Sequence, residues 1–165
     1  MKIIQGALSI HIVIPPNWHS DWEWGLSLIL LTVVLHVLAL GYLRQRTSLA
    51  ISRMMERRHP TLVFVVVMGT VTLLATCLHG LEAGIWAAAY QLIGALPNSR
   101  SAMLFSLNAM TSYGQTDLRL EDNWRLMGAI ESLNGWLLFG MTTAFLFSMI
   151  QKVWILDSGT AASGR

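Results

Sequence analysis

Three long apolar stretches constrain this chain more strongly than any other feature of its sequence. The first covers residues 25–43 and holds a single ionisable side chain, His36. A helix of about eighteen residues, rising about 1.5 Å per residue, is about 27 Å long and matches the hydrocarbon thickness of a bilayer. Further apolar helices are predicted at 61–95 and 131–156. The sequence therefore predicts an all-α membrane protein with three transmembrane helices.

The composition agrees with a membrane protein. The chain is 54% hydrophobic and 12% charged, whereas soluble domains carry about 25% charged residues. Trp18, Trp22 and Trp24 precede the first stretch and Tyr42 closes it. Aromatic residues at both ends of an apolar stretch are typical of membrane interfaces.

The motif content argues against catalysis. The sequence holds no Gly-rich phosphate loop, no Ser-His-Asp pattern and no HExxH motif, so we expect neither an enzyme nor a bound cofactor. Its basic residues fall at the predicted membrane surface, so no nucleic-acid partner is expected. Cys77 is a single cysteine and cannot form an internal disulfide.

Basic residues predict the orientation of the chain. The connection at 44–60 holds five arginines: Arg44, Arg46, Arg53, Arg57 and Arg58. By the positive-inside rule this connection is cytoplasmic, which places residues 1–24 outside and the C-terminus inside. We expect 44–60 to form a basic amphipathic helix on the inner surface, able to bind anionic lipids from Arg44 to Arg58. The Ser/Gly/Ala-rich tail at 157–165 is predicted to be disordered.

A short segment between the second and third spans follows a different pattern. Pro97-Asn98-Ser99 is a helix-start signal, and the helix predicted at 99–110 is too short to cross a bilayer. Glycine-containing backbone follows it. Such backbone is tolerated at membrane depth only where it is buried in protein or lines water. The pattern therefore favours a re-entrant loop on the outer side.

Local motifs around this loop carry a resemblance to a known family. They are His79-Gly-Leu-Glu82 with Ile85-Trp86-Ala87 and Tyr90, then Ala102 with Phe105-Ser106, then Trp124-Arg125-Leu126, Glu131, Gly135, Leu138-Phe139-Gly140, Thr143-Ala144 and Leu146-Phe147. In order and spacing, they resemble the pore domain of bacterial potassium-channel-type proteins. The resemblance covers 61–156 and leaves the first span as an addition.

The resemblance implies an outer helix at 61–95, a pore helix at 99–110, a filter at 111–117 and an inner helix at 131–156. It also implies a homotetramer in the bacterial inner membrane, with potassium as the permeant ion and no other cofactor or metal.

The predicted filter departs from the family pattern in its outer half. Its residues are Thr111, Ser112, Tyr113, Gly114, Gln115, Thr116 and Asp117, aligned with the family's Thr-Thr-Val-Gly-Tyr-Gly-Asp. Gln115 replaces the aromatic residue and Thr116 replaces the second glycine. A rival register places Tyr113-Gly114 on the family's Tyr-Gly; the first register is preferred because it needs no gap.

Backbone geometry gives these replacements a consequence. A potassium filter points backbone carbonyls inward, and part of that geometry needs a positive φ, which Gly114 can supply. Thr116 is β-branched and disfavours positive φ. We therefore expect a filter that is shorter, wider or more flexible, with weakened or changed selectivity. The C-terminal end of the 99–110 helix, with Asp117 and the nearby Glu121 and Asp122 at the outer mouth, would still favour cations.

Two carboxylates near the outer membrane edge are candidates for holding the filter. Glu82 and Glu131 could brace it from behind, paired with Asp117, Arg119 or Arg125. Both could equally be interfacial carboxylates in water.

Two histidines lie in or near the spans. His36 is a functional candidate because it is ionisable inside a membrane helix, or a neutral imidazole hydrogen-bonded to a neighbouring helix. His79 could respond to pH, or have a capping or interfacial role. His79 and Glu82 share a helix face and could bind a metal, although two ligands alone are a weak signal.

The predicted inner helix holds the candidates for cavity and gate. Gly135 and Gly140 are sites of close packing or a hinge, and Thr142 and Thr143 are candidates to line the cavity. Phe147 or a neighbouring apolar residue could form a hydrophobic gate or simply pack between subunits.

These expectations converge on a passive cation channel, conducting potassium or weakly selective among monovalent cations. Two alternatives remain open. One is a non-conducting, channel-like sensor or regulatory subunit; the other is a divalent-metal permease using Asp117, Glu121 and Asp122.

Overall fold

The computed structural model describes residues 18–54, 60–114 and 118–163. The described part of the chain forms helices joined by short turns and contains no strand, with long helices α1 (Trp18–Met54), α2 (Pro60–Leu92) and α4 (Arg125–Ser163). A short helix α3 (Ser99–Met110) and a 3-10 turn η1 (Asp122–Trp124) lie between α2 and α4. The all-α prediction is confirmed for these residues.

The three long helices are apolar enough to cross a membrane. The candidate spans are Trp18–Leu49, Thr61–Leu92 and Arg125–Gln151. Their exposed faces carry large aliphatic and aromatic side chains, among them Leu30, Leu38, Val65 and Phe139. Because lipid chains solvate such side chains, we treat the chain as a membrane protein.

Helix ends follow recognisable capping chemistry. Pro60 opens α2 at a position where its missing N–H is not needed. Gly94 closes α2 with a φ of 72°, while the N–H of Ala95 donates to the carbonyl of Tyr90 at 2.9 Å, as in a Schellman motif. Asn98 caps α3 by accepting from the N–H of Ser101 at 2.8 Å. The predicted bounds of this short helix are those observed.

Two long helices extend further than the sequence predicts. α1 does not stop at residue 43 but continues to Met54, so a separate surface helix beginning at residue 44 is wrong. α4 begins at Arg125 rather than residue 131 and continues to Ser163, into the tail for which disorder is predicted. No proline follows Pro97, so neither extension of α4 meets a residue that breaks helices.

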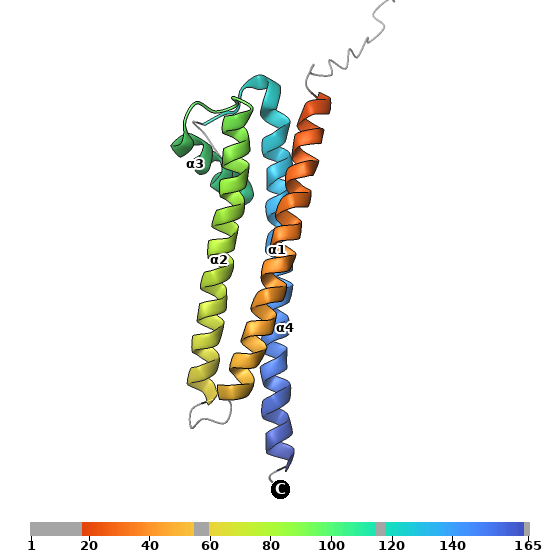
Figure 1. Cartoon of the computed structure of the whole chain (residues 1–165), viewed down its shortest axis with the longest axis vertical. Helices are drawn as coiled ribbons and strands as arrows, with labels where there is room; N and C mark the ends of the chain where they lie inside the picture. The colour runs from red at the N-terminus through yellow and green to blue at the C-terminus, as the bar shows by residue number, and fades with distance from the viewer. Residues whose placement is uncertain (1–17, 55–59, 115–117, 164–165) are drawn as a thin grey trace, which may run out of the picture.

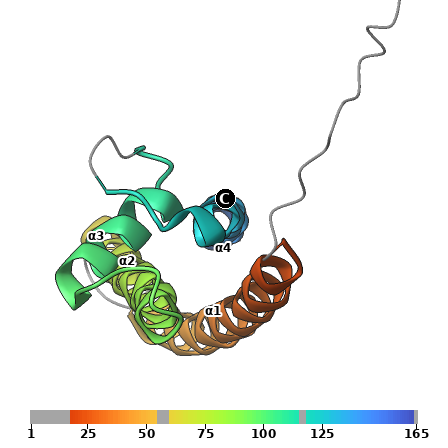
Figure 2. The same ribbon diagram turned by 90° about the horizontal axis from the view of Figure 1, so that it is seen from above.

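The long helices lie lengthwise beside one another, and α3 packs at one end of the molecule (Figure 1). Seen from above, α3, α2 and α1 form an arc that partly surrounds α4 (Figure 2). The short helix α3 contacts both α2 and α4, while α1 contacts the same two helices. The end of α1 and the start of α2 lie at the end opposite α3 (Figure 1).

The interior of this arrangement is unusually polar for a membrane protein. Trp86, Tyr90, Met127 and Leu138 are fully buried. The same buried group also contains six polar side chains: Thr32, His36, Glu82, Ser106, Glu131 and Asn134. Ionisable side chains inside a membrane domain are costly unless paired and usually mark functional sites.

Candidate functional site

The C-terminal end of α3 lies against α4 at Gly135. A Cβ atom at this glycine would come within 2.2 Å of the carbonyl oxygen of Met110. No side chain fits in that space, so Gly135 permits the close approach of the two backbones. Of the two alternatives for Gly135, close packing accounts for this geometry. Gly140 differs, because a Cβ there would have nothing within 4 Å.

The backbone after α3 turns with alternating left-handed residues. Ser112 has a φ of 52° and Gly114 a φ of 82°. The N–H of Tyr113 donates to the carbonyl of Asn108 at 3.0 Å, and Trp136 Nε1 donates to Ser112 Oγ at 2.8 Å. Ser112 is thus held in a conformation that is uncommon for a residue with a side chain. Gly114 supplies the positive φ expected of it.

This turn is exposed and lies close to the middle of the candidate spans. Thr111, Ser112, Tyr113 and Gly114 are all exposed, Tyr113 by 83%. A pocket of about 420 Å³ runs beside the turn, lined by Thr76 and His79 of α2, by Leu107, Met110 and Thr111, and by Gly135, Trp136 and Phe139 of α4. Thr76 and Phe139 lie near the middle of their spans. The turn therefore starts beside the middle of two candidate spans.

A second pocket of about 390 Å³ lies on the other side of the turn. Its lining includes Asn108, Ser112 and Gly114, together with Arg119 and Arg125. The turn is consequently flanked by open space on two sides rather than by packed side chains. Gln115, Thr116 and Asp117 lie outside the described residues.

Glu131 joins α4 to α2 and α3 through buried hydrogen bonds. The hydroxyl of Tyr90 donates to Glu131 Oε2 at 2.6 Å, and Ser106 Oγ contacts Glu131 Oε1. Ser106 Oγ also lies 2.7 Å from the carbonyl oxygen of Ala83. Glu131 therefore contacts the short helix through Ser106 and α2 through Tyr90, and its bracing of the filter stays a prediction.

The two contacts of Ser106 Oγ, with the Ala83 carbonyl and with Glu131, each need one hydrogen. A hydroxyl has one hydrogen, and the Ala83 carbonyl can only accept. If Ser106 donates to Ala83, the contact between Ser106 and Glu131 needs a hydrogen from the carboxyl group. A protonated Glu131 satisfies every contact of this cluster.

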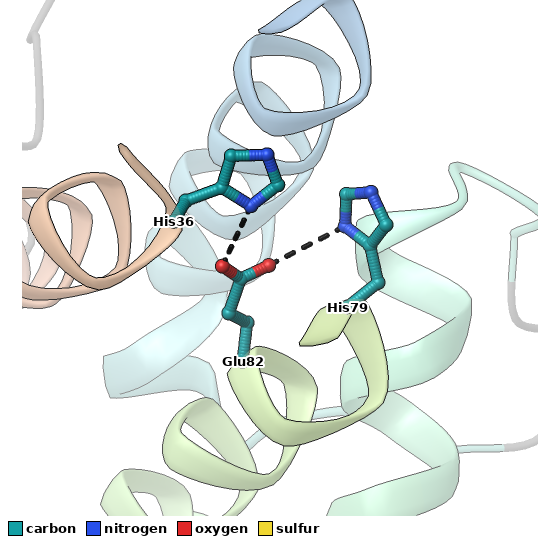
Figure 3. Close-up of side chains that lie close together, drawn as sticks. All are labelled: His36, His79 and Glu82. Carbon is teal, nitrogen blue, oxygen red and sulfur yellow. Dashed lines mark hydrogen bonds and ion pairs between the residues drawn. The ribbon is translucent and has the colours of Figure 1, made fainter. Parts of the chain in front are cut away.

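Glu82 belongs to a second buried cluster with two histidines (Figure 3). Its Oε1 lies 2.8 Å from His36 Nδ1 on α1, and its Oε2 lies 3.4 Å from His79 Nδ1 on α2. Glu82 is 1% exposed, His36 0% and His79 28%. The contacts described for the Glu82 carboxylate are with these two histidines, and bracing of the filter through Asp117, Arg119 or Arg125 stays a prediction because Asp117 lies outside the described residues.

Thr142 completes this cluster from α4. Its Oγ1 lies 3.0 Å from His36 Nε2 and 3.1 Å from His79 Nε2. Thr142 is buried, so in the single chain it faces the histidines rather than a cavity. Thr143, Phe147 and Gly140, the other cavity and gate candidates, are exposed on α4.

The remaining site predictions are only partly described. Asp122 opens η1, but its side chain lies outside the described residues. Glu121 is exposed beside it. A further buried pair was missed from the sequence: Asn134 Nδ2 of α4 donates to Thr32 Oγ1 of α1 at 2.9 Å. The sequence shows Thr32 and Asn134 as polar residues within apolar stretches. Nothing in it indicates that their side chains form a hydrogen bond.

No protein-family model, no curated protein and no solved structure matches the chain. The resemblance to potassium-channel-type pores consequently rests on the local motifs alone.

Proposed function

We propose that this chain is one subunit of a homotetrameric membrane pore that conducts monovalent cations passively. The observation that carries the proposal is the exposed, non-helical turn from Thr111 to Gly114, held at membrane depth by Gly135 and flanked by two pockets. The number of copies, the bacterial inner membrane as location and potassium as the default ion come from the resemblance.

Exposed backbone at this depth needs a partner. Each backbone polar group left unsatisfied in hydrocarbon costs several kcal/mol, so irregular backbone must be covered by protein or line water. A ring of copies provides both conditions, because each turn then meets its symmetry mates around an aqueous path. A single copy supplies only one side of such a path.

The sign of the permeant ion follows from the groups that face the turn. Helix α3 ends there, and the C-terminal end of a helix carries partial negative charge. Thr111 and Ser112 add hydroxyl oxygens, and no residue from Thr111 to Gly114 is charged. Partial negative charge without a fixed carboxylate suits a weakly held monovalent cation.

Flux into liposomes tests the proposal. Purified wild-type protein should pass potassium, and sodium to a lesser or similar degree. Gly114→Ala should reduce the flux at least several-fold, because a side chain disfavours the φ of 82° by about 1–2 kcal/mol. A Cβ there would meet nothing within 4 Å, so packing within the chain is unaffected.

Gly94→Ala is the matched control. Gly94 also has a positive φ, 72°, and a Cβ there also meets nothing within 4 Å, but it lies in the connection before α3. It should leave the cation flux close to that of the wild-type protein. If wild-type protein passes no monovalent cation under any pH or voltage, conduction is excluded and a non-conducting channel-like role takes its place. Flux of calcium alone would instead favour the permease alternative.

A further inference from the structure

We propose that His36, His79 and Glu82 form a binding site for one divalent transition-metal ion of the zinc or cobalt type, inside the membrane domain. The site does not depend on conduction. Its ligands come from two helices, so a bound ion would join α1 to α2.

The geometry suits three ligands on one ion. The ligand atoms of His36, His79 and Glu82 all lie within 4.8 Å of one another. Ligands about 2.0–2.2 Å from a tetrahedral zinc ion are separated by about 3.3 Å. The observed separations lie on either side of that value, at 2.8 Å between His36 Nδ1 and Glu82 Oε1 and 3.4 Å between His79 Nδ1 and Glu82 Oε2. Small side-chain rotations therefore bring all three onto an ion.

With both imidazoles neutral and the carboxylate ionised, the hydrogens available to this cluster do not satisfy its contacts without an ion. Four polar contacts are present: each Nδ1 faces Glu82, and each Nε2 faces Thr142. Two neutral imidazoles and one hydroxyl supply three hydrogens, and an ionised carboxylate supplies none. One contact must lack a hydrogen, and Glu82 Oε2 is a buried oxygen without a hydrogen-bond partner.

A metal ion at the two Nδ1 atoms removes this deficit. Both rings then carry their hydrogen on Nε2, and both Nε2–H groups can donate to the two lone pairs of Thr142 Oγ1. The ion also compensates the charge of Glu82, whose partners are otherwise two imidazoles. Thr142 thus orients the histidines without binding the ion.

The donor set and the surroundings define the class of ion. Imidazole nitrogen suits zinc, cobalt and nickel, whereas calcium and magnesium prefer oxygen ligands. Two histidines and one glutamate leave a fourth position for water. His79 lines the 420 Å³ pocket beside Thr111, which gives an ion and its water a route to the site.

Metal titration of the full chain in lipid nanodiscs tests the proposal, with a purification tag that lacks histidine. Zinc is measured by competition with a chromophoric chelator, and cobalt by its visible absorption. The expected result is one ion per chain. His11→Ala/His19→Ala/His59→Ala removes the other three histidines of the sequence and should retain that binding.

Substitutions of the metal-binding residues should weaken zinc binding. His79→Ala and the isosteric Glu82→Gln should each weaken zinc binding by at least 100-fold, and Thr142→Val by about 10- to 100-fold, as for partners of metal-bound histidines. Zinc should raise the thermal unfolding midpoint of wild-type protein but not that of Glu82→Gln.

Two outcomes overturn the proposal. One is wild-type protein that binds neither zinc nor cobalt stoichiometrically; the fourth hydrogen then comes from a proton on one imidazole. The other is binding that survives in Glu82→Gln and His79→Ala but is lost in the triple histidine variant.

Discussion

Gly135 is the residue on which the placement of the exposed turn depends most directly. Because Gly135 has no side chain, the Met110 carbonyl can lie directly against the backbone of α4. Gly140, five residues later in the same helix, has open space where a Cβ would stand. The two glycines therefore differ in packing while sharing the same helix, which makes them a matched pair.

Gly135→Ala should destabilise the protein, and Gly140→Ala should not. A Cβ at Gly135 would lie 2.2 Å from a backbone oxygen, which only a movement of α3 can relieve, at a cost of about 1–3 kcal/mol. Alanine at Gly140 gains about 1 kcal/mol of helix propensity. Thermal unfolding in nanodiscs, followed by tryptophan fluorescence, checks the difference. Equal midpoints for the two variants would mean that α3 does not pack on Gly135.

Helix α3 is fixed at the scale of the element by contacts along its length. Asn98 caps its start, Ser106 meets Glu131 in its middle, and Met110 meets Gly135 at its end. Ser106 and Glu131 are buried, and Tyr90 brings α2 into the same cluster. A change at Glu131 therefore acts on three helices together.

Glu131→Gln should be tolerated, whereas Glu131→Ala should not. A glutamine amide can donate to Ser106 Oγ and accept from the Tyr90 hydroxyl, which reproduces the hydrogens of a protonated carboxyl group. Alanine leaves both hydroxyls without their partner and opens a cavity, with an expected loss of about 2–5 kcal/mol. The thermal unfolding midpoints of the two variants show whether glutamine retains the stability that alanine loses. If Glu131→Gln loses as much stability as Glu131→Ala, the carboxyl is ionised and the hydrogen count is wrong.

Elements with local signals were predictable, and contacts between elements were not. The bounds of α3 follow from Asn98 and from the turn at Ser112 and Gly114, all within a few residues of its ends. The predicted stops at 43 and 156 were wrong because the glycines near them, Gly41 and Gly159, both lie inside helices, where glycine costs only about 1 kcal/mol relative to alanine. Glu82 and His36 are 46 residues apart, and pairing over such a distance leaves no periodic pattern in one sequence.

At the scale of the whole molecule, the three spans place the chain ends on opposite sides of the membrane. The start of α1 and α3 lie at one end, whereas the end of α1 and the end of α4 lie at the other (Figure 1). Arg44 and Arg46 lie in the last turns of the described part of α1 and are exposed. By the positive-inside rule, we expect this end to face the cytoplasm.

Cysteine labelling tests this orientation. In a Cys77→Ala background, Ser20→Cys and Glu121→Cys should react with a membrane-impermeant maleimide on intact cells, because both positions lie at the end of the molecule that carries α3. Gln45→Cys and Gln151→Cys, both exposed at the opposite end, should react only after permeabilisation. The reverse pattern would place the arginines outside and contradict the rule for this chain. Labelling of Ser20→Cys and Gln45→Cys from the same side would contradict the first span itself, since α1 would then lie on the membrane rather than cross it.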